Sequence, residues 1–403
     1  MTLSSAEATV FERVELPDDP SLPSLPQLFD FDWVCRTVQN GAGTQPRRIR
    51  IHHFIHSIGN SATVSYEVQW PLDSYLPSDY HVATTGRDGR IDIRRYPDDR
   101  RLPGLVFAAR PDRALQIVNA QVLTVPARRA RVQLIRYRPG FRAVLRHRFG
   151  RLKLYARVVR PGDIESFLAA YELSAQSGYL VPGLAGCWDE GGVLWFTELR
   201  GSTLRRRIRK GKAPHPDELL TGLEVLWQVP HRGSKVRPLN LERAYRRAMR
   251  SFKHNLRDFP ESSRNLQKLE DRLSPFVQSW QPASMAHNDF YDDQLLVLRG
   301  GRLALVDFED IAPGDPLLDV GNFLAHLRWA SHFARELRAE NCRDYYDGLR
   351  VAALSRFGWS ERSLSLREAT CLFRISTNAI RHPKADWHSR LDAGLLLVGE
   401  TLG

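Results

Sequence analysis

The sequence lacks the cysteine spacings of a disulfide framework or a structural zinc site. Its four cysteines, Cys35, Cys187, Cys342 and Cys371, are far apart and form no C-x-x-C pair, which is typical of reduced thiols in a cytoplasmic protein. No stretch approaches the roughly 18 apolar residues that a membrane-spanning helix needs. The first residues, MTLSSAEATVFERVELPDD, show no basic start followed by an apolar segment, so no secretory signal is predicted. We therefore expect a cytoplasmic protein with no membrane segment.

The chain does have an ordinary globular composition and an excess of positive charge. Its 403 residues are 42% hydrophobic and 26% charged, which is enough apolar material for two or three domains. The formal net charge is +12, and much of it lies between Arg200 and Arg250, around LRRRIRKGKAPH. Such a patch can attract nucleic acid or an anionic substrate. No aromatic residues interleave with the charges, as a base-stacking surface requires, so a solvated helix end is the simpler interpretation and nucleic acid is not an expected partner.

The order of sequence patterns predicts an α+β fold. Residues 1–45 are rich in Pro, Asp and Ser and predict a partly ordered lead-in. Strand–turn–strand patterns follow over residues 47–70 and again over 131–162. The sequence pattern common to β-hairpins explains their similarity as well as an internal duplication does. After Gly201 helical periodicity dominates, interrupted by one hairpin. We expect a β-rich N-terminal extension over residues 1–125, a small β lobe over 126–200 and a helical lobe over 201–403.

The hairpin in the helical part carries an unusual set of polar residues. In HNDFYDDQLLVLRGGRLALVDFED, two short apolar strands flank the turn RGGR. Asp289 and Gln294 precede the first strand and Asp307 follows the second, so the three side chains should converge at one end of the hairpin. Carboxylate and carboxamide oxygens gathered in this way suit Mg²⁺, and a separate Asp can orient a hydroxyl group in phosphoryl transfer. A surface hairpin made soluble by its acids explains poorly why these residues flank strands that must be buried.

These residues resemble the catalytic core of the aminoglycoside phosphotransferase and choline kinase-like family, which has a two-lobed protein-kinase-like fold. HNDFYDDQ is similar to the family's His-x-Asp-x-x-x-x-Asn segment, and GDPLLDVGNF to its Gly-Asp-Pro-x-x-Asp segment. The resemblance covers about residues 130 to 400 and implies ATP and Mg²⁺ as cofactors. It implies that Asp289 is the catalytic base, that Asp307 is the principal metal ligand, and that Gln294 stands where the family usually has Asn. It further implies that Asp319 anchors the catalytic loop and that His287 holds the loop in shape.

The resemblance also assigns residues of the small lobe. Arg157 stands where the family carries a phosphate-gripping Lys, with Glu172 of the following helix as its ion-pair partner. Lys153, four residues earlier on the same strand face, is the alternative. The phosphate-covering loop corresponds to YRPGFR, residues 137–142, which has a single glycine. The adenine-binding hinge corresponds to FTELRG, in which Glu198 and Leu199 offer backbone groups.

The function predicted from these residues is ATP- and Mg²⁺-dependent phosphorylation of a hydroxyl group on a small molecule. Glu309, Asp310 and Asp315 favour a cationic acceptor, whereas the basic segment over 200–250 favours a sugar, a nucleoside or an anionic acceptor; the sequence leaves both open. The alternative is a regulatory nucleotide-binding protein that keeps the kinase-like fold without turnover. Gln294, Arg157 and the glycine-poor loop favour that alternative.

Overall fold

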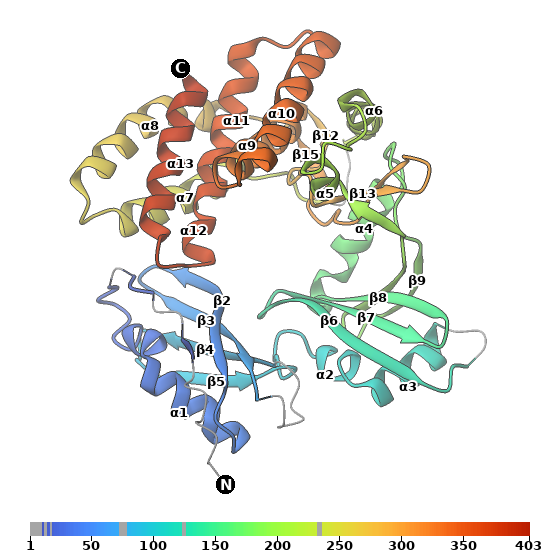
Figure 1. Cartoon of the computed structure of the whole chain (residues 1–403). Helices are drawn as coiled ribbons and strands as arrows, with labels where there is room; N and C mark the ends of the chain where they lie inside the picture. Colours follow the sequence, from blue (N-terminus) through green and yellow to red (C-terminus); the bar gives the residue numbers. More distant parts are fainter. Residues whose placement is uncertain (1–9, 12–13, 17, 72–78, 123–125, 232–235) are drawn as a thin grey trace.

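The computed structural model of the chain describes residues 10–11, 14–16, 18–71, 79–122, 126–231 and 236–403. Two five-stranded sheets lie beside each other under a mostly helical lobe (Figure 1), so the predicted α+β class is confirmed. Residues 1–9, the start of the segment in which no secretory signal was predicted, lie outside the described part. Within the described ranges, no helix has the length and apolar character needed to cross a membrane.

The first sheet is built from residues before position 96. Its strands, in spatial order, are β1 (Val10–Phe11), β2 (Arg48–Ser57), β3 (Ser61–Gln69), β4 (Asp79–Gly86) and β5 (Ile91–Arg95). The predicted strand–turn–strand over residues 47–70 is therefore confirmed. The second half of the expected, partly ordered lead-in forms η1 (Pro26–Phe29) and α1 (Phe31–Ala42). Asp30 initiates α1 because its carboxylate accepts a hydrogen bond from the backbone N–H of Trp33 at 2.6 Å.

The second sheet forms the small lobe. Its spatial order is β6 (Ala130–Arg138), β7 (Arg142–Phe149), β8 (Leu152–Val158), β10 (Val193–Thr197) and β9 (Leu184–Trp188), and α4 (Ile164–Ser174) follows β8. Helices α2 (Leu105–Ala108) and α3 (Pro111–Gln121) pack on this sheet, sharing an apolar core with Leu102, Val158 and Trp195. Residues from about 102 to 121 thus complete the core of the small lobe.

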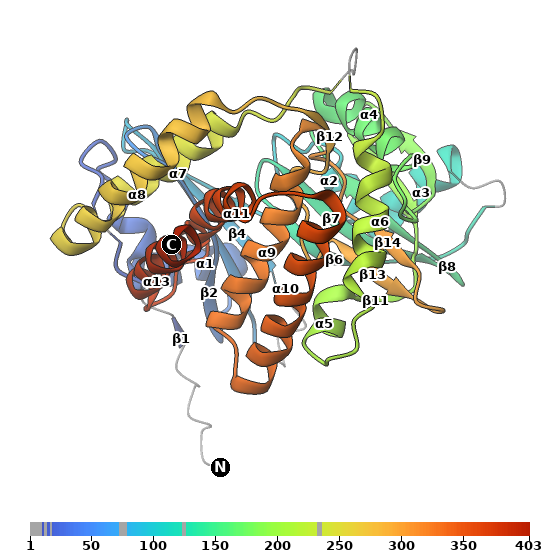
Figure 2. The same ribbon diagram turned by 90° about the horizontal axis from the view of Figure 1, so that it is seen from above.

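The remaining residues form the helical lobe. Its elements are β11 (Gly201–Thr203), α5 (Leu204–Ile208), α6 (Pro216–Trp227), α7 (Leu241–Asn255), α8 (Pro260–Ser279), β12 (Ser284–Ala286), β13 (Leu295–Leu298), β14 (Leu303–Leu305), β15 (Ala312–Gly314), α9 (Pro316–His332), α10 (Glu336–Phe357), α11 (Glu361–Ser376), α12 (Asn378–Arg381) and α13 (Trp387–Leu402). Seen from above, α9 and α10 run side by side through the middle of this lobe, with α7 and α8 on one side and α5 and α6 on the other (Figure 2).

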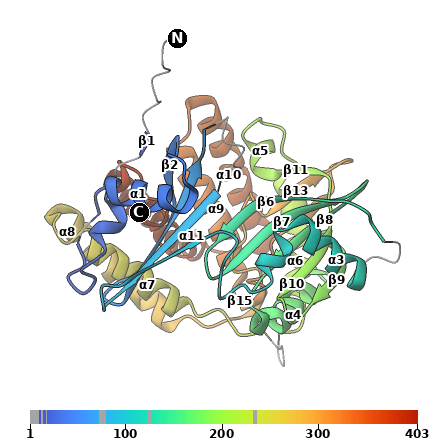
Figure 3. The same ribbon diagram turned by 90° about the horizontal axis from the view of Figure 1, so that it is seen from below.

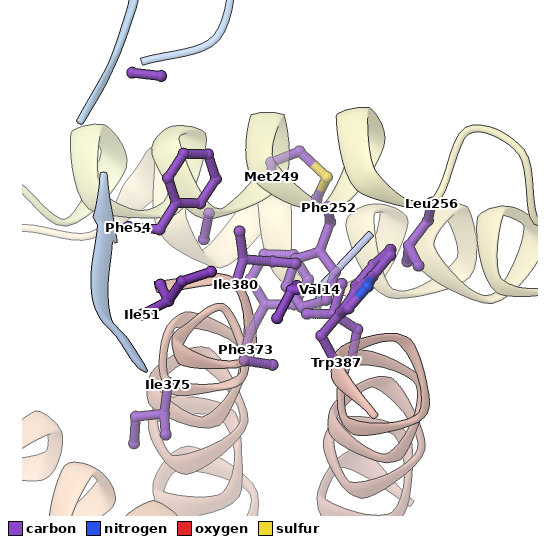
Figure 4. Close-up of a cluster of buried hydrophobic side chains, with 14 of the residues drawn as sticks. Val14, Ile51, Phe54, Met249, Phe252, Leu256, Phe373, Ile375, Ile380 and Trp387 are labelled. Atoms are coloured by element: carbon purple, nitrogen blue, oxygen red, sulfur yellow. The ribbon is translucent and has the colours of Figure 1, made fainter. Parts of the chain in front are cut away.

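A shared apolar core joins the first sheet to the helical lobe. Phe54 of β2 is buried in one cluster with Phe252 of α7 and Phe373 of α11, and Ile380 and Trp387 complete it from α12 and α13 (Figure 4). Burial of such aromatic side chains contributes roughly 2–3 kcal/mol each. The first sheet is therefore packed against the helical lobe and lies beside the small lobe (Figures 1 and 3).

Candidate active site

The loop that precedes the catalytic hairpin is held from inside the helical lobe by Asp319. The carboxylate of Asp319, near the start of α9, accepts hydrogen bonds from the backbone N–H groups of His287 at 2.8 Å and Asn288 at 2.7 Å. The indole N–H of Trp227 donates a third, at 3.0 Å. Burial raises the pKa of the Asp319 carboxyl, and these hydrogen bonds oppose that rise. The expectation that Asp319 anchors this loop is confirmed.

Two neighbouring residues give the loop its shape. Asn288 has a positive φ of 64°, a left-handed conformation that Asn tolerates better than most residues. Its side-chain amide donates to the carbonyl oxygens of Asp310 and Ala312 at 3.0 and 3.1 Å. The ring Nε2 of the buried His287 lies 2.7 Å from the carbonyl oxygen of Asp307. His287 thus links the loop to the residue that follows the second strand of the hairpin, which is the geometry of a positioning residue.

The hairpin brings the backbone of Gln294 to the end at which Asp307 lies. Leu295 pairs with Leu305, and the backbone N–H of Val306 donates to the carbonyl oxygen of Gln294 at 2.9 Å. Gln294 therefore lies beside the segment that carries Asp307. The pKa of Asp310 is raised to about 6 by burial and then by the charges of Asp289, Asp307 and Glu309, so four carboxylates share this end of the hairpin.

Two arginines of the small lobe hold Asp307. The guanidinium of Arg157 lies 3.1 and 3.2 Å from one carboxylate oxygen, and Arg142 lies 3.4 Å from the other. Both arginines also pair with Glu309. Burial alone would raise the pKa of Asp307, but the guanidinium groups of Arg157 and Arg142 outweigh it and lower the pKa to about 2. Asp307 is therefore ionised, and the two small-lobe arginines compensate the charge of its carboxylate.

The predicted ion pair between Arg157 and Glu172 is wrong. Glu172 is exposed on α4, and among the ion pairs of the described residues none joins it to Arg157. The physical reason is the face of α4 that meets the hairpin: Phe167 and Tyr171 contact the ring of Phe308 there, and Arg157 stacks on Phe167 and Phe308. Aromatic side chains occupy the place where a carboxylate was expected.

Lys153 lies at the other end of β8 from Arg157. Its ammonium group is 3.1 and 3.3 Å from the two carboxylate oxygens of Glu198, and the strand register places Leu154 opposite Thr197. Lys153 therefore does not replace Arg157 at Asp307. Glu198 and Leu199 follow β10 where the chain passes from the small lobe into the helical lobe.

Sequence reasoning missed two arginines that contact the acids of the site. Arg142 begins β7, and Arg374 extends from α11 to within 3.2 Å of Asp289 while donating to Asn322 at 2.8 Å. The signal for Arg142 was its place in the quoted turn segment YRPGFR. Arg374 had none, because 85 residues separate it from Asp289.

The acids expected to line a cationic acceptor site are mostly engaged elsewhere. Asp315 is only 4% exposed; its carboxylate caps α9 and also binds Arg367 and Trp280, each at 3.1 Å. The expectation that Asp315 lines the cleft is therefore wrong. Glu309 is paired with Arg142 and Arg157, and Asp310 alone of the three lines the cavity without an ion pair among the described residues.

The oxygen donors at the hairpin end fit Mg²⁺ carried on a nucleotide. Among the residues that the structure describes, no three His, Cys, Asp or Glu side chains are grouped as a metal site. Mg²⁺ in phosphoryl-transfer sites is commonly held by one or two carboxylates, with phosphate oxygens and water completing its octahedron. Asp307, with Gln294 beside it, meets that smaller requirement.

The turn predicted to cover the phosphates is already fixed by side chains. Gly140 has φ 69°, its N–H donates to Asp99 at 2.7 Å, and its carbonyl oxygen accepts from Arg160 at 2.8 Å. The hydroxyl of Tyr137 donates to the same Asp99 carboxylate. This backbone N–H is not available to cradle a phosphate, unlike those of a glycine-rich loop.

A large cavity lies in front of the catalytic loop. Its volume is about 1700 Å³, and its walls come from β2, α7, the α11–α12 corner, the catalytic loop and the tip of the β6–β7 hairpin. Asp289 and Asp310 both face it. The first sheet therefore contributes one wall of the space in which an acceptor would meet Asp289.

Comparison with known proteins agrees with this geometry. The family model described as "Phosphotransferase enzyme family" matches residues 140–354. The choline kinase from Cryptosporidium parvum Iowa II superposes with a TM-score of 0.51 at 11% identity, over 72% of this chain and 94% of that one. A putative aminoglycoside phosphotransferase from Ralstonia eutropha gives 0.49 at 16% identity, over 72% and 97%. No curated protein sequence matches. The chain belongs to the phosphotransferase enzyme family and has a two-lobed protein-kinase-like fold.

Proposed function

We propose that this protein transfers the γ-phosphoryl group of ATP to a hydroxyl group of a small molecule, with Mg²⁺ as cofactor. One observation carries the proposal: the anchored loop presents Asp289 to the cavity while the adjoining hairpin holds Asp307 against Arg142 and Arg157. An ATP-dependent reaction and four unpaired cysteines favour the cytoplasm as its location.

Each residue has a distinct task in this reaction. Asp307 and Gln294 would hold Mg²⁺, which would supply positive charge at the phosphates. Arg157 and Arg142 bind phosphate oxygens from the small lobe and steady the charge that spreads over them. Asp289 accepts a hydrogen bond from the acceptor hydroxyl and takes its proton as the new oxygen–phosphorus bond forms. The bond from the γ-phosphorus to the bridging oxygen breaks, and ADP leaves.

The test is ATP turnover by the purified protein beside Asp307→Asn. We expect slow, Mg²⁺-dependent ATP hydrolysis without an acceptor, and its loss in the variant, because Asn carries no charge to hold the metal. Asp293→Asn is the matched control, since Asp293 is an exposed carboxylate of the same loop that pairs with Arg205. Hydrolysis that persists in Asp307→Asn would remove Asp307 from the mechanism.

Nucleotide binding without transfer is the second candidate function. Two features favour it: arginines already neutralise Asp307, and the N–H of Gly140 is bonded to Asp99. In that case the protein binds Mg²⁺-ATP in calorimetry but releases no phosphate and phosphorylates no acceptor. The two candidates therefore differ in turnover while agreeing in binding.

A further inference from the structure

The charge of the cavity is the opposite of what a cationic acceptor requires. Among its described lining residues, ten are Arg or Lys and five are Asp or Glu. Two of those five acids are already neutralised, because Asp289 pairs with Arg374 and Glu309 pairs with Arg142 and Arg157. The carboxylates left to attract a cation are few.

Four cavity arginines, which we call the arginine cluster, have no carboxylate of their own. Arg136 and Arg138 come from the end of β6, Arg247 from α7 and Arg381 from α12. In the described part of the chain none of the four forms an ion pair, and the Nε of Arg138 is buried without a hydrogen-bond partner. Three separate elements thus direct cations into one space.

The members of the cluster repel one another. The pKa of Arg381 is lowered to about 10, first by burial and then by the charges of Arg138, Arg374 and Arg247. Burial likewise lowers the pKa of Arg138, with Arg142 and Arg136 adding to the effect. Unpaired cations in a partly desolvated space destabilise the fold. A bound anion would therefore lower the free energy of the folded protein by compensating their charge.

The first sheet holds this arrangement in place. The ring of His53 packs 5.0 Å from that of His382, and Nδ1 of His382 lies 3.0 Å from the carbonyl oxygen of His52. Burial, followed by His382, Arg138 and Arg381, lowers the pKa of His53 to about 3, so the ring of His53 adds no charge to the cluster. The N-terminal sheet therefore supports the corner that carries Arg381.

We propose that the acceptor is itself an anion, a phosphorylated or polycarboxylated hydroxyl compound whose anionic group binds the arginine cluster while its hydroxyl meets Asp289. Asp289 and the four arginines line the same cavity. Arg374, which pairs with Asp289, lies at the end of α11, directly before the short helix α12 that carries Arg381. This inference rests on the proposed function for the identity of the reaction. The anion site itself does not depend on it.

Binding of inorganic pyrophosphate tests the site directly. The titration is made with saturating Mg²⁺-ADP, so that the nucleotide site is filled, on wild type, Arg138→Gln, Arg381→Gln and Arg247→Gln. We expect each substitution to weaken binding by about tenfold, the value of one charge-assisted hydrogen bond. Arg246→Gln is the control, because Arg246 is an exposed neighbour on α7 that pairs with Glu242 and does not line the cavity. Equal affinity in Arg381→Gln and wild type overturns the proposal.

Stability gives a second readout that needs no ligand. Because the cluster is self-repelling, Arg381→Gln and Arg138→Gln should fold and should melt at the same temperature as wild type or higher, whereas Arg246→Gln should not gain stability. A lower melting temperature in both cluster variants, unrelieved by pyrophosphate, would show that these arginines are structural and would also overturn the proposal.

Acceptor selectivity separates this inference from the proposed function. We expect phosphorylation of a sugar phosphate or a nucleoside monophosphate at least about tenfold more efficiently, in kcat/KM, than of the matching sugar or nucleoside. Preference for choline or an aminoglycoside, or tighter binding of a single-stranded RNA than of pyrophosphate, would contradict it. If pyrophosphate fails to bind but hydrolysis still depends on Asp307, the proposed function stands alone; if pyrophosphate binds and ATP does not, the anion site stands alone.

Discussion

The two walls of the active cavity treat charge differently. Where the small lobe meets the β13–β14 hairpin, which we call the paired wall, Arg142 and Arg157 pair with Asp307 and Glu309. The end of β6, together with α7 and α12, forms what we call the unpaired wall, where the four arginines of the cluster form no ion pair among the described residues. Ion pairs hold these side chains in place without a ligand, and a nucleotide would have to replace some of the ion pairs when it binds. Unpaired cations instead favour whatever anion enters.

The largest effect expected on this comparison comes from Asp289, which lies between the walls. Asp289→Asn removes the proton acceptor and the charge that holds Arg374, so kcat should fall by about 10²–10⁴-fold. ADP affinity should stay within about twofold of wild type, because the paired wall is untouched. Steady-state kinetics with ATP and calorimetry with ADP measure the two. A variant that loses ADP binding as well would show that the walls are not independent.

Asp319 should give the next largest effect, because its carboxylate holds the backbone of the loop that carries Asp289. Asp319→Ala leaves the buried N–H groups of His287 and Asn288 without acceptors, at about 1–3 kcal/mol each. We expect a melting temperature several degrees lower and a loss of turnover. Asp347→Asn, an exposed carboxylate on α10, is the control. Unchanged stability in Asp319→Ala would mean that the loop is held in another way.

The sequence predicted local features well and long-range ones poorly. The hairpin, its RGGR turn and the convergence of Gln294 with Asp307 follow from a motif of 24 residues, because a tight hairpin fixes the distance between its ends. Glu172 failed as a partner because its orientation depends on which face of α4 meets Phe308, and aromatic packing decides that. Arg374 and Arg381 lie on helices remote in sequence, so no local pattern relates them to Asp289.

The same limit applies to the N-terminal region. Its strands were predicted from alternation, but its contribution to the cavity depends on Phe54 joining the apolar cluster of Phe252 and Phe373, about 200 and 320 residues later in the chain. Helix α1 was hidden by a lead-in rich in Pro and Asp, although Asp30 is its cap. These features arise from tertiary contacts, which composition does not report.

A smaller effect is expected from Arg157, and it tests the paired wall. Arg157→Ala should raise the KM for ATP and lower kcat, and Arg157→Lys should recover part of both, by about tenfold relative to Ala, because Lys keeps the charge but not the fork that reaches Asp307 and Glu309. Glu172→Gln should leave both constants unchanged, since Glu172 is exposed and unpaired with Arg157. A marked loss in Glu172→Gln would restore the ion pair that the structure does not show.

The smallest effect concerns the unpaired wall and its dependence on pH. Asp310 lines the cavity with a pKa raised to about 6 by burial and by Asp289, Asp307 and Glu309, above the usual value of about 3.9. Below pH 6 Asp310 is therefore neutral and the cavity more positive; as pH rises through about 6 it gains a negative charge. Sulfate, which stays doubly charged between about pH 5 and 8, should bind about two- to threefold more weakly at the upper end, a modest change because water and salt in the cavity screen the added charge. In Asp310→Asn the affinity for sulfate should no longer depend on pH and should equal the affinity of wild type below pH 6. His53, with its pKa near 3, does not titrate in this range, so a slope that survives Asp310→Asn would assign the titration to another group.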